Sequence, residues 1–264
     1  MELTISLAQM DIALGQPQVN LAKVQELTAE AMRRGSDVVL FPELWSTGYD
    51  LENAEQYATS LDEGLFAGLA ALARENTIHI CGSLLSLQDG RYCNTAPLFS
   101  PAGKRLGHYS KIHLFRLMDE DRYLAAGQVA PVFDLPWGKS ALAICYDLRF
   151  PELFRRYALA EARIIFLLAE WPYPRLEHWR TLLQARAIEN QMFIAACNRV
   201  GESKGERFFG HSAIYDPWGR LVVEAGDSEV LLTASVDMAL VEEVRQAIPI
   251  FADRRPELYW RCQK

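Results

Sequence analysis

Short apolar runs recur along the chain, and their length constrains the fold more than any other feature of the sequence. Each spans only four to six residues, so it fits a buried strand better than a helix, which needs about ten or more. The clearest runs occupy positions 37–41, 141–144, 163–168 and 192–197. Between them lie segments with apolar residues at helical spacing, such as Leu176, Trp179 and Leu183. This alternation predicts an α/β protein in which helices flank sheets that mix parallel and antiparallel strand pairs.

Three helix starts can be placed from local signals. Asn20 is expected to cap a helix that Gly35 closes, because Asn is favoured before a helix and Gly after one. Ser60 and Glu63 have the spacing of a capping box, which predicts a second helix just after them. Pro151 suits the first turn of a third helix, where its missing N–H is not needed.

The remaining elements follow from apolar periodicity. Positions 176–190 predict a fourth helix. Further strands are expected at 3–10, 78–85, 92–99, 212–215, 221–223 and 229–236, with 216–219 as the turn of a hairpin. No repeat, low-complexity tract or linker divides the chain, so we expect a single domain over residues 1–264.

Composition excludes several classes of protein. The net charge of −7 argues against a general nucleic-acid binder, because phosphate contacts need clustered Lys and Arg. No apolar run approaches the roughly 18 residues of a membrane span, and no basic region precedes the first strand as in a signal peptide. Five cysteines without a CxxC pair argue against a disulfide framework, and the five histidines lack metal-ligand spacing. We therefore expect a cytoplasmic protein that uses no metal and binds neither nucleic acid nor membrane.

Cys145 stands at the end of the apolar run 141–144, where a strand would deliver its thiol to the rim of a sheet. Such a cysteine more often serves core packing, and as a nucleophile it would need a base or a cation nearby. Glu43 follows the run 37–41, where apolar surroundings would raise the pKa of its carboxyl. Lys111 precedes another apolar alternation. Because ends of neighbouring strands share one rim, these three side chains can converge.

A cysteine–histidine hydrolase of unrelated fold is the alternative interpretation of the same thiol. It would require a histidine base, and the candidates are His113, within an apolar alternation, and His211, which follows a glycine at a strand start. Substituting each histidine separates the two hypotheses, because a Glu-Lys-Cys mechanism needs neither.

Five segments, in this order, resemble the nitrilase superfamily of carbon–nitrogen hydrolases. The segments are FPELWSTGYD (41–50), KIHLFRLMDE (111–120), ICYDLRFPELFR (144–155), AEWPYPRLEHWRTLLQARAIENQMFIAACNRVG (169–201) and GHSAIYDPWGR (210–220). The similarity runs from the first strand to Val236. It implies a four-layer α-β-β-α sandwich, no cofactor, and homodimers formed through the helices at 151–161 and 176–190.

The resemblance also assigns catalytic roles. The superfamily's Glu-Lys-Cys triad corresponds to Glu43, Lys111 and Cys145, and a second glutamate to Glu120, with Asp119 as the alternative position. Glu43 is then the general base, and Lys111 helps to lower the pKa of the thiol. Lys111 and the backbone N–H of Tyr146 would stabilise the oxyanion of a thioester-forming reaction.

Within the superfamily, the motifs are most similar to the omega-amidase branch, whose bacterial members accompany methionine salvage. That branch removes the terminal amide of 2-oxo acids such as 2-oxoglutaramate. The resemblance implies substrate contacts from Tyr49, Glu170 and Trp171, and Arg149 is a candidate partner for a substrate carboxylate. Other possible activities are those of an N-carbamoyl amino acid amidohydrolase, a nitrilase, an acyl-transferring relative or a non-catalytic binding member.

Overall fold

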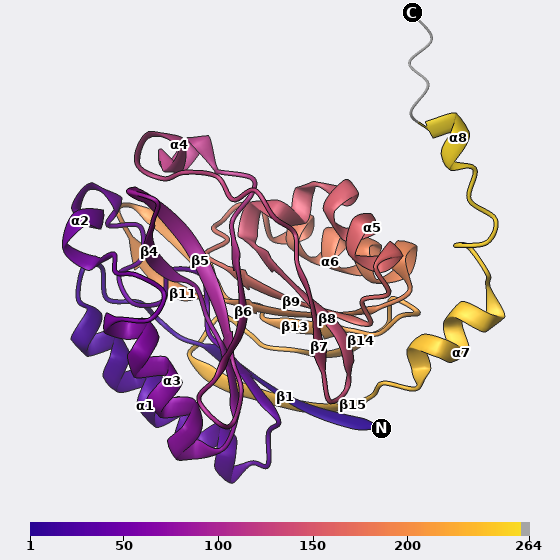
Figure 1. Ribbon diagram of the computed structural model, residues 1–264, viewed down its shortest axis with the longest axis horizontal. Coiled ribbons are helices and arrows are strands. Elements are labelled where there is room, and N and C mark those ends of the chain that lie inside the picture. Colours follow the sequence, from indigo (N-terminus) through magenta and orange to yellow (C-terminus); the bar gives the residue numbers. More distant parts are fainter. Residues whose placement is uncertain (260–264) are drawn as a thin grey trace, which may run out of the picture.

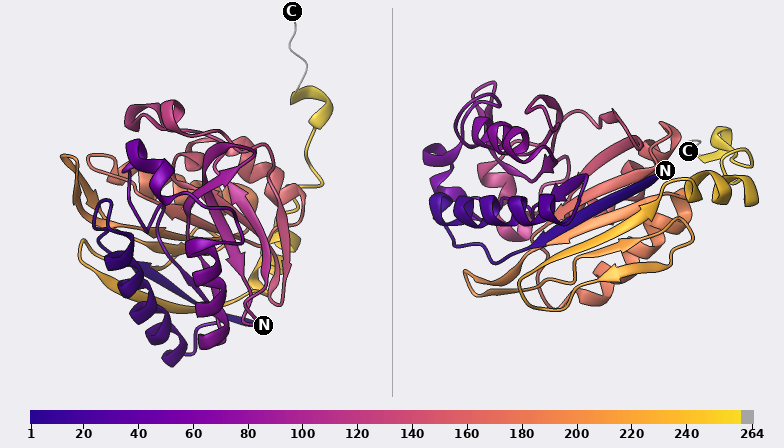
Figure 2. Two further views of the ribbon diagram at one scale, coloured as in Figure 1. Left: turned by 60° about the vertical axis from the view of Figure 1, so that its left-hand side comes forward. Right: turned by 90° about the horizontal axis from the view of Figure 1, so that it is seen from below.

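The computed structural model describes residues 1–259, so positions 260–264 of the expected domain lie outside the described residues. Two mixed sheets pack face to face, with helices on both outer sides (Figure 1). The outer helices are α1 (Pro17–Arg33) and α3 (Gly64–Asn76) on one side, and α5 (Pro151–Leu159) and α6 (Leu176–Asn190) on the other. Figure 2 shows the same arrangement from two further directions. The predicted α-β-β-α sandwich is confirmed.

The first sheet has seven strands in the order β15-β1-β2-β3-β5-β4, and β6 also pairs with β5. Its strands are β1 (Glu2–Gln9), β2 (Val38–Leu40), β3 (His79–Cys81), β4 (Leu84–Gln88), β5 (Arg91–Phe99), β6 (Arg105–Ser110) and β15 (Val230–Asp237). The pairs β1–β2 and β2–β3 are parallel and the others antiparallel, as expected for a mixed sheet.

The second sheet has six strands in the order β14-β13-β10-β9-β8-β7. Its strands are β7 (Val132–Leu135), β8 (Gly138–Ile144), β9 (Ile164–Ala169), β10 (Phe193–Asn198), β13 (Ala213–Tyr215) and β14 (Leu221–Glu224). The three central strands β8, β9 and β10 run parallel, which explains why their sequences are apolar on both faces. A separate two-stranded ribbon is formed by β11 (Val200–Ser203) and β12 (Glu206–Phe209).

Side-chain alternation divides the apolar residues between two cores. Leu3, Ile5 and Leu7 of β1 point into the core between the sheets, which they share with residues of β8, β9 and β10. Val39 and Phe41 point the other way and pack against α1 and α3. A period of two places alternate residues on opposite faces, so one strand supports both layers.

The helix expected to be capped by Asn20 begins earlier. Pro17 is already in the first turn, and Asn20 lies fully buried inside the helix. The Asn20 side chain binds the backbone of Ala13 and Ser46, so it anchors the preceding loop and does not cap the helix. The capping prediction was wrong because Pro17 offers an equally good helix start that the apolar pattern does not reveal. Gly35 follows the helix with a φ of 75°, as expected.

Two other local predictions need correction. Ser60 and Glu63 hydrogen-bond through their side chains at 2.9 Å, so no capping box forms before α3. The expected strand at 78–85 is divided into β3 and β4. The break includes Gly82, where an added Cβ would come within 2.8 Å of Phe41 and Trp45, so the close approach requires glycine. Both β3 and β4 pair with β5.

The remaining described elements are short or lie toward the C-terminus. They are η1 (Leu51–Asn53), α2 (Ala54–Tyr57), η2 (Arg116–Met118), α4 (Glu120–Tyr123), η3 (Cys145–Arg149), α7 (Leu240–Ala247) and α8 (Pro256–Tyr259). After α7 the chain extends away from the sheets, and α8 lies apart from them (Figures 1 and 2). No helix within residues 1–259 combines the length and apolar character needed to cross a bilayer.

Candidate active site

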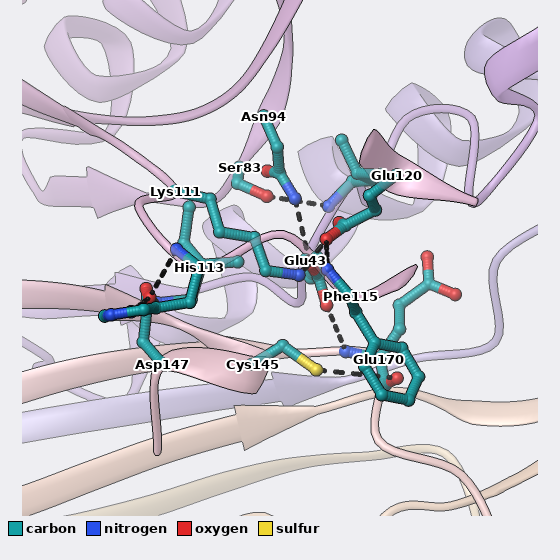
Figure 3. Close-up of polar contacts among 12 residues, drawn as sticks. Glu43, Ser83, Asn94, Lys111, His113, Phe115, Glu120, Cys145, Asp147 and Glu170 are labelled. Atoms are coloured by element: carbon teal, nitrogen blue, oxygen red, sulfur yellow. Dashed lines mark hydrogen bonds and ion pairs between the residues drawn. The ribbon is translucent and has the colours of Figure 1, made fainter. Parts of the chain in front are cut away.

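Three strand ends bring Glu43, Lys111 and Cys145 together (Figure 3). Glu43 follows β2, Lys111 follows β6, and Cys145 follows β8, so the first two come from one sheet and the thiol from the other. Cys145 has a φ of 43°, in the left-handed region that non-glycine residues rarely adopt. Such conformations concentrate at functional sites, where the surrounding structure holds them.

The Glu43 carboxylate is fully buried and receives hydrogen bonds on both oxygens. Its Oε1 accepts from Lys111 Nζ at 2.7 Å and from Asn94 Nδ2 at 2.8 Å. Its Oε2 accepts from the backbone N–H of Glu170 at 3.0 Å. These contacts hold the carboxylate in place near the thiol of Cys145, whose pKa it raises.

Lys111 lies between two buried carboxylates. Its Nζ donates to Glu43 Oε1 at 2.7 Å and to Glu120 Oε1 at 2.8 Å. Burial disfavours the charged amine, but attraction to Glu120 and Glu43 outweighs burial and raises the pKa of Lys111, so the ammonium persists. Burial raises the pKa of the Glu120 carboxyl, and attraction to Lys111 acts in the opposite direction without cancelling this rise. The Tyr49 hydroxyl lies 3.0 Å from each of these two carboxylates.

Of the two candidates for the second glutamate, Glu120 is the one that contacts Lys111. Asp119 is partly exposed and pairs with Arg122 at 3.2 Å. The structure therefore distinguishes between the two neighbouring acids that the sequence left as alternatives, because only Glu120 contacts Lys111.

Cys145 is buried, and its Sγ lies 3.8 Å from the carbonyl oxygen of Glu170. Burial, followed by repulsion from Glu43, raises the pKa of the thiol well above its ordinary value. Lys111 acts in the opposite direction, as expected, but it does not prevail. The effect of Lys111 on the thiol pKa thus has the expected direction, but desolvation is larger, so the net shift is upward. The environment of Cys145 therefore favours the neutral thiol over the thiolate.

A buried aspartate that the sequence did not single out connects two of these strand ends. Asp147 accepts hydrogen bonds from Tyr109 Oη at 2.7 Å, His113 Nδ1 at 2.7 Å and the backbone N–H of Ile144 at 2.9 Å. Tyr109 and His113 flank Lys111 in the sequence, whereas Ile144 precedes Cys145. One carboxylate thus joins the segment that carries the amine to the turn that carries the thiol.

A small pocket opens beside the thiol. It is lined by Cys145, Phe115, Tyr146, Arg149, Glu170, Trp171, Pro172 and Arg175. The Arg149 guanidinium lies 4.8 Å from the centre of the Trp171 ring, and that of Arg175 lies 5.9 Å from the centre of Phe115. Neither arginine forms an ion pair with an acidic side chain within residues 1–259. Sequence reasoning missed Arg175, since nothing near it in the chain indicated that its helix start faces the cysteine.

The other predicted pocket residues divide between two places. Trp171 lines the pocket beside Cys145. Tyr49 lies deeper, between the carboxylates that hold Lys111. Glu170 contributes its backbone to the thiol and to Glu43, but its side chain points away from Cys145 (Figure 3). There Glu170 Oε2 accepts from Arg199 Nη1 at 3.0 Å.

Neither histidine of the alternative hypothesis hydrogen-bonds to Cys145. His113 Nδ1 binds Asp147, and His211 Nδ1 binds Glu224 at 2.8 Å. Both rings are therefore held by carboxylates other than Glu43. This geometry favours Glu43 over either histidine as the base.

Comparison with known proteins places the chain in a family. The carbon-nitrogen hydrolase family profile matches residues 4–246. The 2-oxoglutaramate amidase of Bacillus subtilis (strain 168) is 43% identical over 260 residues, covering 98% of this chain and 100% of that protein. The omega-amidase NIT2 of Mus musculus is 32% identical over 254 residues, covering 91% of each chain.

Solved structures agree with this likeness. A CN-hydrolase superfamily protein of Xanthomonas campestris, with an arsenic adduct in its active site, has a TM-score of 0.91 at 30% identity and covers 97% of this chain and 98% of its own. A mutant amidase from Nesterenkonia sp. AN1 carries the acetamide moiety of fluoroacetamide on its active-site cysteine. Its TM-score is 0.87 at 28% identity, covering 98% of this chain and 97% of its own. This chain belongs to the carbon–nitrogen hydrolase family and is an amide-hydrolysing enzyme.

Proposed function

We propose that this enzyme hydrolyses the terminal amide of a small 2-oxo acid, of the 2-oxoglutaramate type, through a thioester on Cys145. The observation that carries the proposal is the meeting of a buried acid, an ammonium and a thiol beside a pocket with two arginines. Relatives named 2-oxoglutaramate amidase and omega-amidase support the substrate class.

The reaction uses Glu43 as the group that moves protons. Glu43 takes the thiol proton while Sγ of Cys145 attacks the amide carbon, and the oxyanion forms against Lys111 and the N–H of Tyr146. Collapse of the intermediate breaks the C–N bond, and Glu43 gives its proton to the departing nitrogen, so ammonia leaves. Water that loses a proton to Glu43 then attacks the thioester, releasing the acid and restoring the thiol.

Arg149 and Arg175 would bind the substrate carboxylate. Arg149 and Arg175 line the same pocket, and burial, followed by repulsion from Arg175, lowers the pKa of Arg149. A bound carboxylate would relieve that repulsion through charge-assisted hydrogen bonds. The arginines therefore select amides that carry an anionic group at the far end from the reacting carbon.

A substrate panel tests this assignment. Ammonia release should be fastest from 2-oxoglutaramate, and slower from a nitrile, an N-carbamoyl amino acid and a neutral amide of similar length. A nitrile or carbamoyl compound as the far better substrate would contradict the substrate class while leaving the Glu-Lys-Cys chemistry intact.

Arg175→Gln and Arg149→Gln should each lower kcat/KM for the 2-oxo acid amide by about tenfold or more, since each removes a hydrogen bond to a charged group. The same variants should lose little with the neutral amide, which serves as the matched control. An equal loss with both substrates would show that the arginines do not bind the carboxylate.

We also propose that the enzyme is a single-domain homodimer located in the cytoplasm. Exposed apolar side chains lie near the outer helices, including Leu159 of α5 and Ile188 of α6. The segment 249–259 extends beyond the sheets and carries Leu258 and Tyr259, which are also exposed. A second copy of the chain would cover these apolar residues. The four described cysteines are free thiols, which suits a reducing compartment.

A further inference from the structure

A second cavity lies on the far side of Glu170 from the pocket at Cys145. Its volume is about 270 Å³. It is lined by Tyr49, Leu51, Glu52, Leu117, Met118, Asp119, Tyr123, Glu170, Ser203, Lys204, Glu206 and Phe208. Glu170 borders both spaces, and Tyr49 connects this cavity to the carboxylates around Lys111. The cavity therefore adjoins the place where the amide bond breaks.

One wall atom of this cavity lacks a hydrogen-bond partner. Glu170 is 1% exposed, and while its Oε2 accepts from Arg199, its Oε1 has no hydrogen-bond donor among the described residues. Figure 3 shows the carboxylate directed away from the thiol. A buried carboxylate oxygen without a donor is costly, so this position favours a ligand that can donate hydrogen bonds.

The two spaces beside Glu170 differ in charge. The pocket at Cys145 carries Arg149 and Arg175. The second cavity is lined by four carboxyl groups, from Glu52, Asp119, Glu170 and Glu206, and by one ammonium, Lys204. Glu52 pairs with Lys204 at 2.7 Å, and Asp119 and Glu170 pair with Arg122 and Arg199, which do not line the cavity. Amide hydrolysis yields an anion and a cation from one site. Arginines would retain the anion and repel the cation, whereas carboxylates would attract the cation.

We propose that the cavity behind Glu170 is a binding site for the ammonium product, through which it leaves the enzyme separately from the acid. The inference rests on the proposed hydrolysis at Cys145. Ammonia departs from the tetrahedral intermediate as a neutral molecule with the proton supplied by Glu43. It then takes one further proton from water and becomes ammonium, which donates to Glu170 Oε1. No covalent bond to the protein forms in this step.

The first experiment measures inhibition by the product. Acid formation is followed at constant ionic strength in ammonium chloride, with sodium chloride and tetramethylammonium chloride as matched salts. Ammonium should inhibit more strongly than either control ion, because it alone both fits beside the buried oxygen and donates hydrogen bonds. Glu170→Gln should raise the ammonium inhibition constant by about tenfold or more, the loss expected for a charge-assisted hydrogen bond.

The comparison within each variant removes effects on basal turnover. Each inhibition constant is expressed relative to sodium chloride, so a change in kcat caused by Glu170→Gln does not enter the result. The matched control is Glu75→Gln, an exposed glutamate on α3, which should leave the ammonium inhibition constant unchanged. Any amide that the enzyme hydrolyses can serve as substrate, so an error in the 2-oxo acid assignment does not affect this test.

The second experiment needs no activity. Crystals of the Cys145→Ala protein are soaked in rubidium chloride, whose cation replaces ammonium and is visible by anomalous scattering. Density within coordination distance of Glu170, together with ammonium-selective inhibition that Glu170→Gln weakens, supports the site. Equal inhibition by the three salts, or the absence of rubidium beside Glu170, overturns it.

Discussion

At the scale of single residues, the reactivity of Cys145 depends on two neighbours that act on its pKa in opposite directions. Burial and Glu43 raise it, whereas Lys111 lowers it. In the proposed mechanism Glu43 takes the proton of this thiol when substrate is present. This arrangement protects a buried thiol from adventitious alkylation and oxidation, since the thiolate is the reactive form.

Glu43→Gln should separate thiol ionisation from catalysis. Removing the negative charge of Glu43 removes one of the contributions that raise the thiol pKa, whereas the opposite effect of Lys111 remains, so the thiol pKa falls and alkylation of Cys145 by iodoacetamide shifts to lower pH. Turnover should nevertheless fall by about 10² or more, because the variant lacks the base that moves protons. Peptide mass spectrometry measures alkylation at Cys145 across pH, with Cys145→Ala as the blank. An alkylation profile that moves to higher pH would refute this assignment of charges.

At the scale of elements, the geometry of the site depends on hydrogen bonds between the segments at the ends of the strands. The segment carrying Lys111 follows the first sheet and the turn carrying Cys145 follows the second, and Asp147 bonds to both. A fully buried carboxylate with several donors is costly to alter, because each lost bond leaves a donor unsatisfied. Asp147 is thus a positioning residue for the amine and the thiol.

Asp147→Asn should lower kcat by about tenfold or more with little change in KM, because the amide nitrogen cannot accept a hydrogen bond and the two segments separate. It should also lower the free energy of unfolding by about 1–3 kcal/mol. The matched control is Asp216→Asn in the turn between β13 and β14, where Asp216 accepts from two backbone N–H groups away from Cys145. Steady-state kinetics and urea unfolding measure both effects. An equal fractional loss of kcat in the two variants would assign Asp147 a purely structural role.

At the scale of the whole molecule, the alternation of strands and helices could be predicted from apolar runs and helical spacing, and the four-layer arrangement from the family resemblance. The meeting of Glu43, Lys111 and Cys145 could be anticipated from the shared rim of the strands and from the family resemblance. The positions of Arg175 and of the Glu170–Arg199 pair could not be predicted, because they depend on how distant segments pack. The periodicity of the sequence does not indicate which way such side chains point. The start of α1 was also missed, since Asn20 resembles a cap while serving as an anchor for another loop.

The proposed dimer gives a prediction at this scale. Leu159→Lys should weaken self-association by about tenfold or more, since it would place a charge in an apolar interface. The matched control is Leu87→Lys on β4 of the first sheet, a leucine of similar exposure, 42% against 46% for Leu159. Sedimentation equilibrium measures both association constants. A wild-type enzyme that remains monomeric at micromolar concentration, or equal weakening by the two variants, would contradict the proposed interface.

The most direct test of the catalytic mechanism is the mass of the enzyme during turnover. Protein mixed with a 2-oxo acid amide is quenched in acid within milliseconds and analysed intact and as peptides. An adduct should appear on the peptide containing Cys145, with the mass of the substrate less ammonia, and it should decay as free acid accumulates. Continued turnover by Cys145→Ala, or an adduct confined to another residue, would contradict the thioester mechanism.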